Sequence, residues 1–229
     1  MKNIALLILS TFLSLLINAQ GWEKTYGVGS SNWGTDVQQT NDGGYIITGD
    51  SYNSPLSSIY LIKIDVHGDT LWTTLFPGLG ESSSTYSSSI LQTENGEYIV
   101  IGTTQALGTL SDSVDNYLMK VNSNGNLIWE KTYGGDFIDR SGAIISTTDN
   151  GFAIIASRKV ETGFSGVYNM SLIKTDSNGN ETWIKVYGDS TGYGNTIEQT
   201  SDGGYLIGGA TDSWGTGWTS GTSDYMLIK

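Results

Sequence analysis

The stretch LIWEKTYGG, residues 127–135, recurs with substitutions at three other places in the chain. Each copy begins with Trp and ends with an aromatic residue followed directly, or after one proline, by glycine: WEKTYG at 22–27, WTTLFPG at 72–78 and WIKVYG at 183–188. A segment that returns four times in one chain is typical of a repeat architecture. The fold is therefore predicted from the period of this repeat.

Two further landmarks keep the same order in every unit. An aromatic residue opens an apolar run after a polar turn, and a second apolar run ends in lysine. The aromatic residues are Tyr45, Tyr98, Phe152 and Tyr205, at intervals of 53, 54 and 53 residues, and the lysines are Lys63, Lys120, Lys174 and Lys229. Each unit thus holds four short runs, which in the first unit lie near 35–40, 44–50, 59–65 and 70–76.

The joints within each unit are rich in Asn, Asp and Gly, which tolerate positive φ and favour tight hairpins. The two middle runs are apolar at nearly every position, which is typical of strands buried on both faces. No stretch after residue 20 shows a 3.6-residue apolar period. We therefore predict an all-β fold, a β-propeller of four-stranded antiparallel blades in about four 54-residue repeats over residues 20–229. A β-solenoid fits less well, because its coils are shorter and poorer in hairpin turns.

The order of the runs raises the question of ring closure. The copy at 22–27 stands alone at the start, and the last unit has three runs up to Lys229. Four blades closed by pairing of the N-terminal strand with the last run is the favoured arrangement, because it leaves no open sheet edge. A piece of a longer array and a ring of eight blades built from two chains stay open, so the expected state is a monomer or a ring-completing dimer.

The N-terminus and the composition indicate an exported protein. Residues 1–19 combine Lys2, an apolar run and a small residue at position 19, as a secretory signal peptide does. No Cys is present, so no disulfide supports the fold. The formal net charge of −12 disfavours nucleic acid and anionic membrane as partners. We expect a secreted, periplasmic or cell-surface protein with no membrane span after cleavage of the signal.

These motifs resemble those of bacterial exported propeller-repeat proteins, whose consensus runs W-x-K-T-Y-G-G, then D-G-G-Y, then Y-L-I-K-x-D-x-x-G-N. The resemblance covers the whole of residues 20–229. The segment DSNGNETW at 176–183 also resembles, more distantly, the docking motif of quinoprotein-like propellers, with one turn residue fewer. The resemblance implies that one tryptophan of each unit packs between adjacent blades as a structural element of the repeat: Trp22, Trp72, Trp129 and Trp183.

Known catalytic and metal-binding patterns fit this chain poorly. His67 is the single histidine and lies in a turn, which disfavours a zinc site or a Ser-His-Asp triad. The turn that begins at Asp176 lacks the glycine position and closing glutamate of an EF-hand. No carboxylate pair stands out from the repeated turn positions. We therefore predict no catalytic residue, no metal and no cofactor.

Candidate binding residues lie where the units differ. The two joints inside each unit would lie on one face of the ring, and the longer, variable loops would lie on the other. Aromatic residues on or beside these loops are the candidate ligand-binding residues: Trp33, Tyr86, Tyr193, Trp214 and Trp218. Such side chains could stack on sugar rings or contact a protein. For the first three, a role in capping the core of the ring is an equally open alternative.

The favoured interpretation is an exported, non-catalytic binding or interaction module for a glycan or a protein. One alternative is an enzyme, either a glycan-active hydrolase or a quinoprotein-like enzyme. The other is a structural repeat fragment of a larger secreted protein. Fold resemblance alone does not decide among them.

Overall fold

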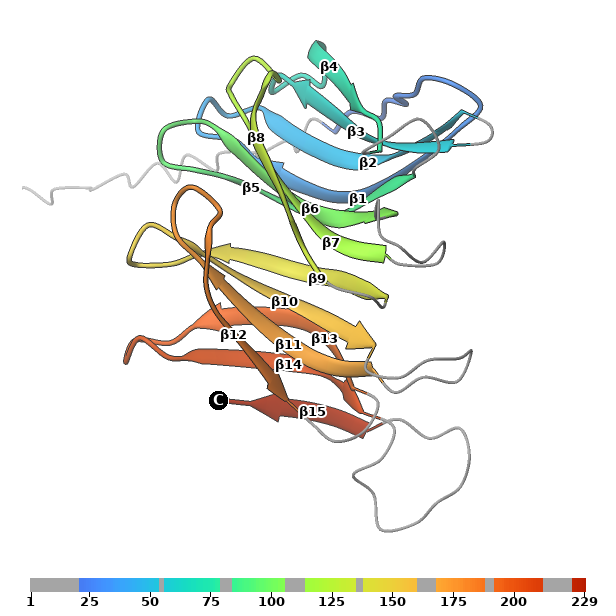
Figure 1. Ribbon diagram of the computed structural model, residues 1–229. Helices are drawn as coiled ribbons and strands as arrows, with labels where there is room; N and C mark the ends of the chain where they lie inside the picture. The colour runs from blue at the N-terminus through green and yellow to red at the C-terminus, as the bar shows by residue number, and fades with distance from the viewer. Residues whose placement is uncertain are drawn as a thin grey trace, which may run out of the picture.

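The computed structural model describes residues 21–53, 56–78, 84–105, 114–134, 138–159, 168–187, 192–211 and 224–229 (Figure 1). The chain in these ranges consists of β-strands and their connections, as the all-β prediction requires. None of it forms a helix with the length and apolar character needed to cross a membrane. The predicted signal peptide lies outside the described residues.

The strands form four antiparallel sheets in which neighbours in the sheet are also neighbours in the chain. Sheet 1 contains β1 (Ser31–Gln39), β2 (Tyr45–Asn53), β3 (Leu56–Ile64) and β4 (Thr70–Phe76). Sheet 2 contains β5 (Thr85–Gln92), β6 (Tyr98–Gln105), β7 (Val114–Val121) and β8 (Leu127–Tyr133). Sheet 3 contains β9 (Asp139–Ser146), β10 (Phe152–Lys159), β11 (Tyr168–Thr175) and β12 (Glu181–Tyr187). Sheet 4 has three described strands, β13 (Gly192–Gln199), β14 (Tyr205–Thr211) and β15 (Asp224–Ile228).

The tight turns form as their composition predicts. A glycine at positive φ closes the first turn of sheets 1, 2 and 4, at Gly43, Gly96 and Gly203. In sheet 3 Asn150 takes this conformation, with φ of 63°. Asparagine is among the few residues with a side chain that enter this region readily. The hairpin prediction is therefore confirmed in the described turns.

The sheets follow one another in a stack, from sheet 1 in blue to sheet 4 in red (Figure 1). The first strand of each sheet contacts the first strand of the next, so β1, β5, β9 and β13 form the inner side of the stack. The two middle strands of sheets 2 and 3 are buried along most of their length. An apolar cluster lies in each interface between successive sheets, with members such as Tyr117, Ile154 and Met170.

The repeated tryptophans contact the following sheet. Trp22 donates from Nε1 to Val66 O in sheet 1, and Trp72 donates likewise to Ser123 O in sheet 2. Trp183 packs on Tyr205 of sheet 4 with ring centroids 6.1 Å apart. Trp129 lies against Gly179 in a turn of sheet 3, where an added Cβ would be 2.6 Å from the indole ring. All four tryptophans therefore lie at junctions between one unit and the next.

The structure does not show a closed ring. Among the described residues, β15 pairs with β14 alone, and its outward side chains Tyr225 and Leu227 are exposed. Residues 22–27 form no strand and lie instead against sheet 1, where Tyr26 donates its hydroxyl hydrogen to Gly68 O. The predicted pairing of this segment with the last strand is thus absent from this conformation, although Trp22 makes the same kind of contact with sheet 1 that Trp72 makes with sheet 2.

The recurring lysines pair with acids of the first turn in each sheet. The partners are Lys63–Asp42 (2.9 Å), Lys120–Glu97 (2.5 Å), Lys174–Asp149 (2.9 Å) and Lys229–Asp202 (2.7 Å). The Lys63 and Lys174 side chains are almost fully buried, and each also donates to a backbone carbonyl. Hydrogen bonds from Thr147 and Lys174 hold the pKa of Asp149 at about 2, below its usual value.

We expect Asp149→Asn to lower stability at neutral pH and to have a much smaller effect near pH 2. A carboxylate with a depressed pKa in the folded state stabilises the fold above its unfolded pKa of about 3.9, and this contribution disappears as pH falls towards about 2. The acid is solvent-exposed, so the loss should be only about 1 kcal/mol. Urea unfolding at pH 7 and pH 2 measures it. Glu94→Gln, at an exposed position in the same turn of sheet 2, is the control, and an equal loss in both variants would contradict the assignment.

Candidate functional site

Three of the predicted binding residues occupy one repeat position on the inner strands. Trp33 on β1, Tyr86 on β5 and Tyr193 on β13 each precede a register shift in the pairing with the next strand. Arg140 holds this position on β9. The exposed fractions of the aromatic residues are 61%, 48% and 36%, and Arg140 is also exposed. These four residues are called the inner-strand row.

Contacts link the inner strands that carry the row. Thr35 Oγ1 lies 2.7 Å from Ser87 Oγ, which links β1 to β5 beside Trp33 and Tyr86. Ser88 donates to Ser141 O at 3.2 Å and links β5 to β9. At the next junction, β9 and β13 approach so closely that a Cβ added to Gly142 would lie 2.4 Å from Gly194 O. Members of the row therefore lie on adjacent strands that contact one another.

The surroundings of the row are polar and partly aromatic. Tyr168 packs against Tyr193, with ring centroids 5.6 Å apart. Asp50 lies opposite Trp33 in the strand pair and accepts hydrogen bonds from Ser87 N and Oγ. Burial raises the pKa of Asp50 from its usual value. The two remaining candidates, Trp214 and Trp218, lie outside the described residues.

The exposure of these aromatic side chains bears on the alternative that they cap the core. Large side chains in the interfaces between sheets, such as Tyr98 and Tyr117, are almost completely buried. Trp33 and Tyr86 instead leave about half of their surface to solvent. These two aromatic side chains are therefore not part of the packed core, and their exposed faces are open to contact with a ligand.

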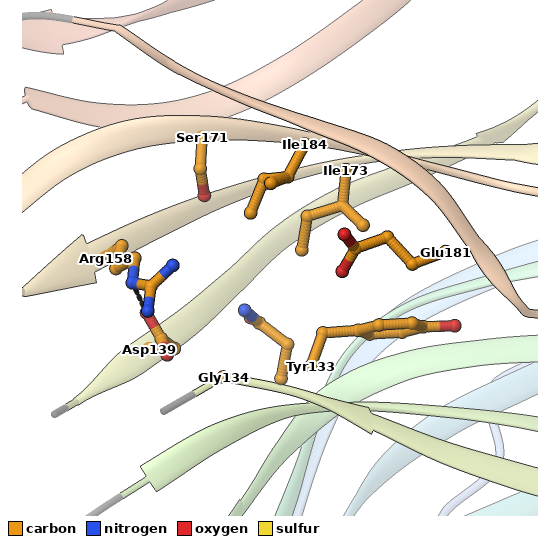
Figure 2. Close-up of a pocket in the computed structure, with 9 residues that line it drawn as sticks. Tyr133, Gly134, Asp139, Arg158, Ser171, Ile173, Glu181 and Ile184 are labelled. Carbon is orange, nitrogen blue, oxygen red and sulfur yellow. Dashed lines mark ion pairs between the residues drawn. The ribbon is translucent and has the colours of Figure 1, made fainter. Parts of the chain in front are cut away.

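A second feature is a cavity of ≈140 Å³ between sheets 2 and 3, called the inter-sheet cavity (Figure 2). Sheet 3 lines it with charged and hydroxyl groups from all four of its strands, and sheet 2 contributes the end of β8 and the start of β7. Its polar lining residues are Asn116, Asp139, Arg158, Ser171 and Glu181. Tyr133 and two isoleucines add apolar surface, so the cavity offers both polar and apolar contacts.

The cavity exists because sheet 3 departs from the repeat. Tyr117 of sheet 2 fills the corresponding place between sheets 1 and 2, whereas sheet 3 has the much smaller Ser171 there. Two neighbouring positions carry a charge in this interface and none in the other two, and a third holds an asparagine where the other two interfaces have an apolar residue. In order, the positions hold Asn116, Asp139, Arg158 and Ser171 here, Ile59, Thr85, Thr104 and Tyr117 between sheets 1 and 2, and Met170, Gly192, Thr211 and Met226 between sheets 3 and 4.

Two of the three charged groups of the cavity come from opposite positions of one strand pair. Asp139 on β9 and Arg158 on β10 face each other in register, and Arg158 Nε lies 3.8 Å from Asp139 Oδ1 (Figure 2). Asp139 is 2% exposed, whereas Arg158 is partly exposed. Tyr133 donates its hydroxyl hydrogen to Gly179 O at 2.5 Å, and burial raises the pKa of this tyrosine.

Sequence reasoning missed the inter-sheet cavity. We predicted that no carboxylate pair would stand out from the repeated turn positions, and that reasoning passed over the single carboxylate of Asp139, which replaces a neutral residue of the other units. An alignment of the four units position by position would have shown Asp139, Arg158 and Ser171 as departures. Within the described residues, no group of three or more His, Cys, Asp or Glu side chains is arranged to hold a metal ion.

Comparisons with known proteins identify a fold but no family. No protein-family model matches the sequence, and no curated protein matches it. An endo-arabinase from Bacteroides thetaiotaomicron VPI-5482 superposes with a TM-score of 0.50 over 84% of this chain and 72% of its own, at 12% identity. The shared feature is a β-propeller-like all-β fold. A protein of unknown function from Bacteroides caccae aligns over 72% of this chain and 70% of its own, at 13% identity and a TM-score of 0.31.

Proposed function

We propose that this chain is a non-catalytic carbohydrate-binding module whose ligand lies on the inner-strand row. The observation that carries the proposal is the set of three exposed aromatic residues and one arginine at the same position of four touching strands. Aromatic faces pack against the C–H faces of sugar rings, and a guanidinium donates hydrogen bonds to hydroxyl oxygens. A row spread over several strands suits an extended glycan better than a single small molecule.

The overall charge supports a neutral ligand. At −12, the protein repels polyanions at long range, so an anionic polysaccharide is a poor candidate. We further propose that the chain is exported and belongs with the propeller-repeat proteins that its motifs resemble. The predicted leader at residues 1–19 supports export, and the fold likeness supports the propeller architecture.

The binding proposal predicts a loss of glycan affinity in Trp33→Ala and Tyr86→Ala. One aromatic contact contributes about 0.5–1.5 kcal/mol, so each variant should raise Kd up to about tenfold and the double variant up to about a hundredfold. A glycan array with neutral plant and bacterial polysaccharides identifies the ligand, and calorimetry measures Kd. Val66→Ala, at an exposed site in the turn after β3, is the control.

Two results would contradict the proposal. One is wild-type affinity in the double variant, which would place the ligand elsewhere on the molecule. The other is an absence of binding to any glycan of the array by folded protein. A protein ligand captured in place of a glycan, with the same dependence on Trp33, would change the ligand class and keep the site.

A glycan-active hydrolase is a second candidate, favoured by one observation. A Cβ built on Gly134 would lie 2.0 Å from Asp115 Oδ1 and 2.8 Å from Asp139 Oδ2, so carboxylates from two sheets approach one point. Paired carboxylates are the usual machinery of glycoside hydrolysis. Release of reducing sugar from arabinan and related glycans, abolished in Asp139→Asn, would support this candidate over simple binding.

We also propose that the propeller has four blades and that residues 22–27 complete the fourth. In sheets 1 to 3, the lysine position of the third strand pairs with the tryptophan of the fourth: Lys63 with Trp72, Lys120 with Trp129 and Lys174 with Trp183. The same register would pair Lys229 with Trp22. It would also cover the exposed edge of β15, which otherwise remains able to pair with other chains.

A further inference from the structure

The inter-sheet cavity is a concerted departure from the repeat and so calls for a functional explanation. Four neighbouring positions change together, and they do so in one of the three interfaces between described sheets. One change removes volume, at Ser171, and the others add polar or charged groups around the space that results. A buried ion pair is commonly no more stabilising than well-packed apolar residues of similar volume. The two flanking interfaces show that this fold packs without such a pair.

We infer that the inter-sheet cavity binds one neutral, polyhydroxylated ring of the size of a single sugar residue. The lining offers donors on Arg158 and Asn116, acceptors on Asp139 and Glu181, and the Ser171 hydroxyl, which can do both. Vicinal hydroxyl groups of a sugar need this mixture, because each hydroxyl both donates and accepts. Ile173 and Ile184 provide an apolar wall for the C–H face of the ring.

The volume of the cavity and the charges of its lining restrict the class of ligand that it can hold. Water occupies about 30 Å³ per molecule in the liquid, so the ≈140 Å³ cavity holds about four or five waters or one small ring. An oligosaccharide is too large for it. The lining carries two acids, Asp139 and Glu181, and one base, Arg158, whose Nε lies 3.8 Å from Asp139 Oδ1, so it favours a neutral ligand over an anion. A free amino acid could use both charges, and it is the competing ligand class that an experiment must separate.

The site does not depend on the inner-strand row. Asp139 and Arg140 are consecutive on β9, yet Asp139 is buried in the cavity and Arg140 is exposed. A binding defect in one feature therefore need not appear in the other. Variants of the row and of the cavity can be tested separately on the same protein.

Ser171→Tyr is the most direct test, because it restores the residue that fills the equivalent space in sheet 2. The purified full chain is titrated with L-arabinose, D-xylose, D-galactose and D-glucose, and binding is followed by calorimetry or by NMR. We expect at least one of these sugars to bind wild type, and Ser171→Tyr to weaken that binding more than tenfold with no loss of thermal stability. Asp139→Asn, which keeps the size of the side chain, should weaken it about tenfold as a second variant.

Matched controls separate this inference from the proposed function. Trp33→Ala should leave monosaccharide binding within twofold of wild type while it impairs glycan binding. Tyr117→Phe, in the interface between sheets 1 and 2, should also bind the sugar as wild type does. The inference is overturned if none of the four sugars binds, if Ser171→Tyr and Asp139→Asn both bind as well as wild type, or if glycine and alanine bind and the sugars do not.

Discussion

Tyr117→Ala is expected to lower the free energy of unfolding by about 3–5 kcal/mol, as truncation of a large buried aromatic side chain does. Tyr117 is 1% exposed and lies in the apolar cluster between sheets 1 and 2. Its hydroxyl donates to the Glu130 carboxylate, and burial together with that acid raises the pKa of the tyrosine. A domain of ordinary stability has about 5–15 kcal/mol in total, so this single change should bring the protein close to unfolding. Urea unfolding followed by Trp fluorescence measures the loss.

Two matched variants separate the effect of the buried ring of Tyr117 from that of its hydroxyl group and from that of losing a tyrosine side chain in general. Tyr117→Phe keeps the ring and loses only the hydrogen bond to Glu130, so about 1 kcal/mol should be lost. Tyr86→Ala removes the same side chain from an exposed position and should change stability by no more than about 1 kcal/mol. Similar losses in Tyr117→Ala and Tyr86→Ala would mean that sheets 1 and 2 do not pack through the described interface.

The parts of the fold that could be predicted from sequence are those with local causes. Turns form where Gly or Asn meets the requirement for positive φ, as at Gly43 and Asn150. Runs without alternation predicted strands buried on both faces, and this is confirmed for the middle strands of sheets 2 and 3. The prediction of burial on both faces is wrong for β15, where Tyr225 and Leu227 are exposed because no further described sheet covers that side.

Ring closure could not be predicted with the same certainty, because it depends on small rotations that add up over several sheet interfaces. Each interface is determined by the side chains that fill it, and no local pattern encodes the sum. The contacts of Trp22 with sheet 1 reproduce those of Trp72 with sheet 2. They specify what the segment docks on, and they leave its strand partner undetermined.

The two candidate sites also differ in how far the sequence alone could reveal them. The aromatic residues of the inner-strand row were found from their type and spacing, and the structure adds Arg140 to them. The inter-sheet cavity depends on the small side chain of Ser171. A single small polar residue in an apolar run does not by itself predict a cavity. Comparison with Tyr117, at the same position of sheet 2, shows that the serine leaves space that a large side chain fills elsewhere.

Closure of the ring by residues 22–27 can be tested by disulfide cross-linking, because this chain contains no cysteine that would compete with an introduced pair. Sheets 1 to 3 pair Leu61 with Thr74, Leu118 with Lys131 and Leu172 with Lys185. The equivalent pair in the fourth blade is Leu227 with Lys24. Directly opposed residues of antiparallel strands have Cβ atoms about 4.5–5.5 Å apart, close enough for a disulfide after small adjustments.

In Lys24→Cys/Leu227→Cys, closure within one chain should therefore give a monomer with an internal disulfide on mild oxidation in dilute solution. Non-reducing electrophoresis and the intact mass, lower by the two hydrogens lost on oxidation, identify this product, and each single variant should remain a free thiol monomer. Disulfide-linked dimers would instead show that two chains complete each other, which contradicts closure within one chain. Unreacted thiols in folded protein would show that neither end finds the other, since strands paired in this register hold the two sulfur atoms within bonding reach. The edge of β15 would then be the place where another strand, from a different part of the full protein or from a partner, completes the sheet.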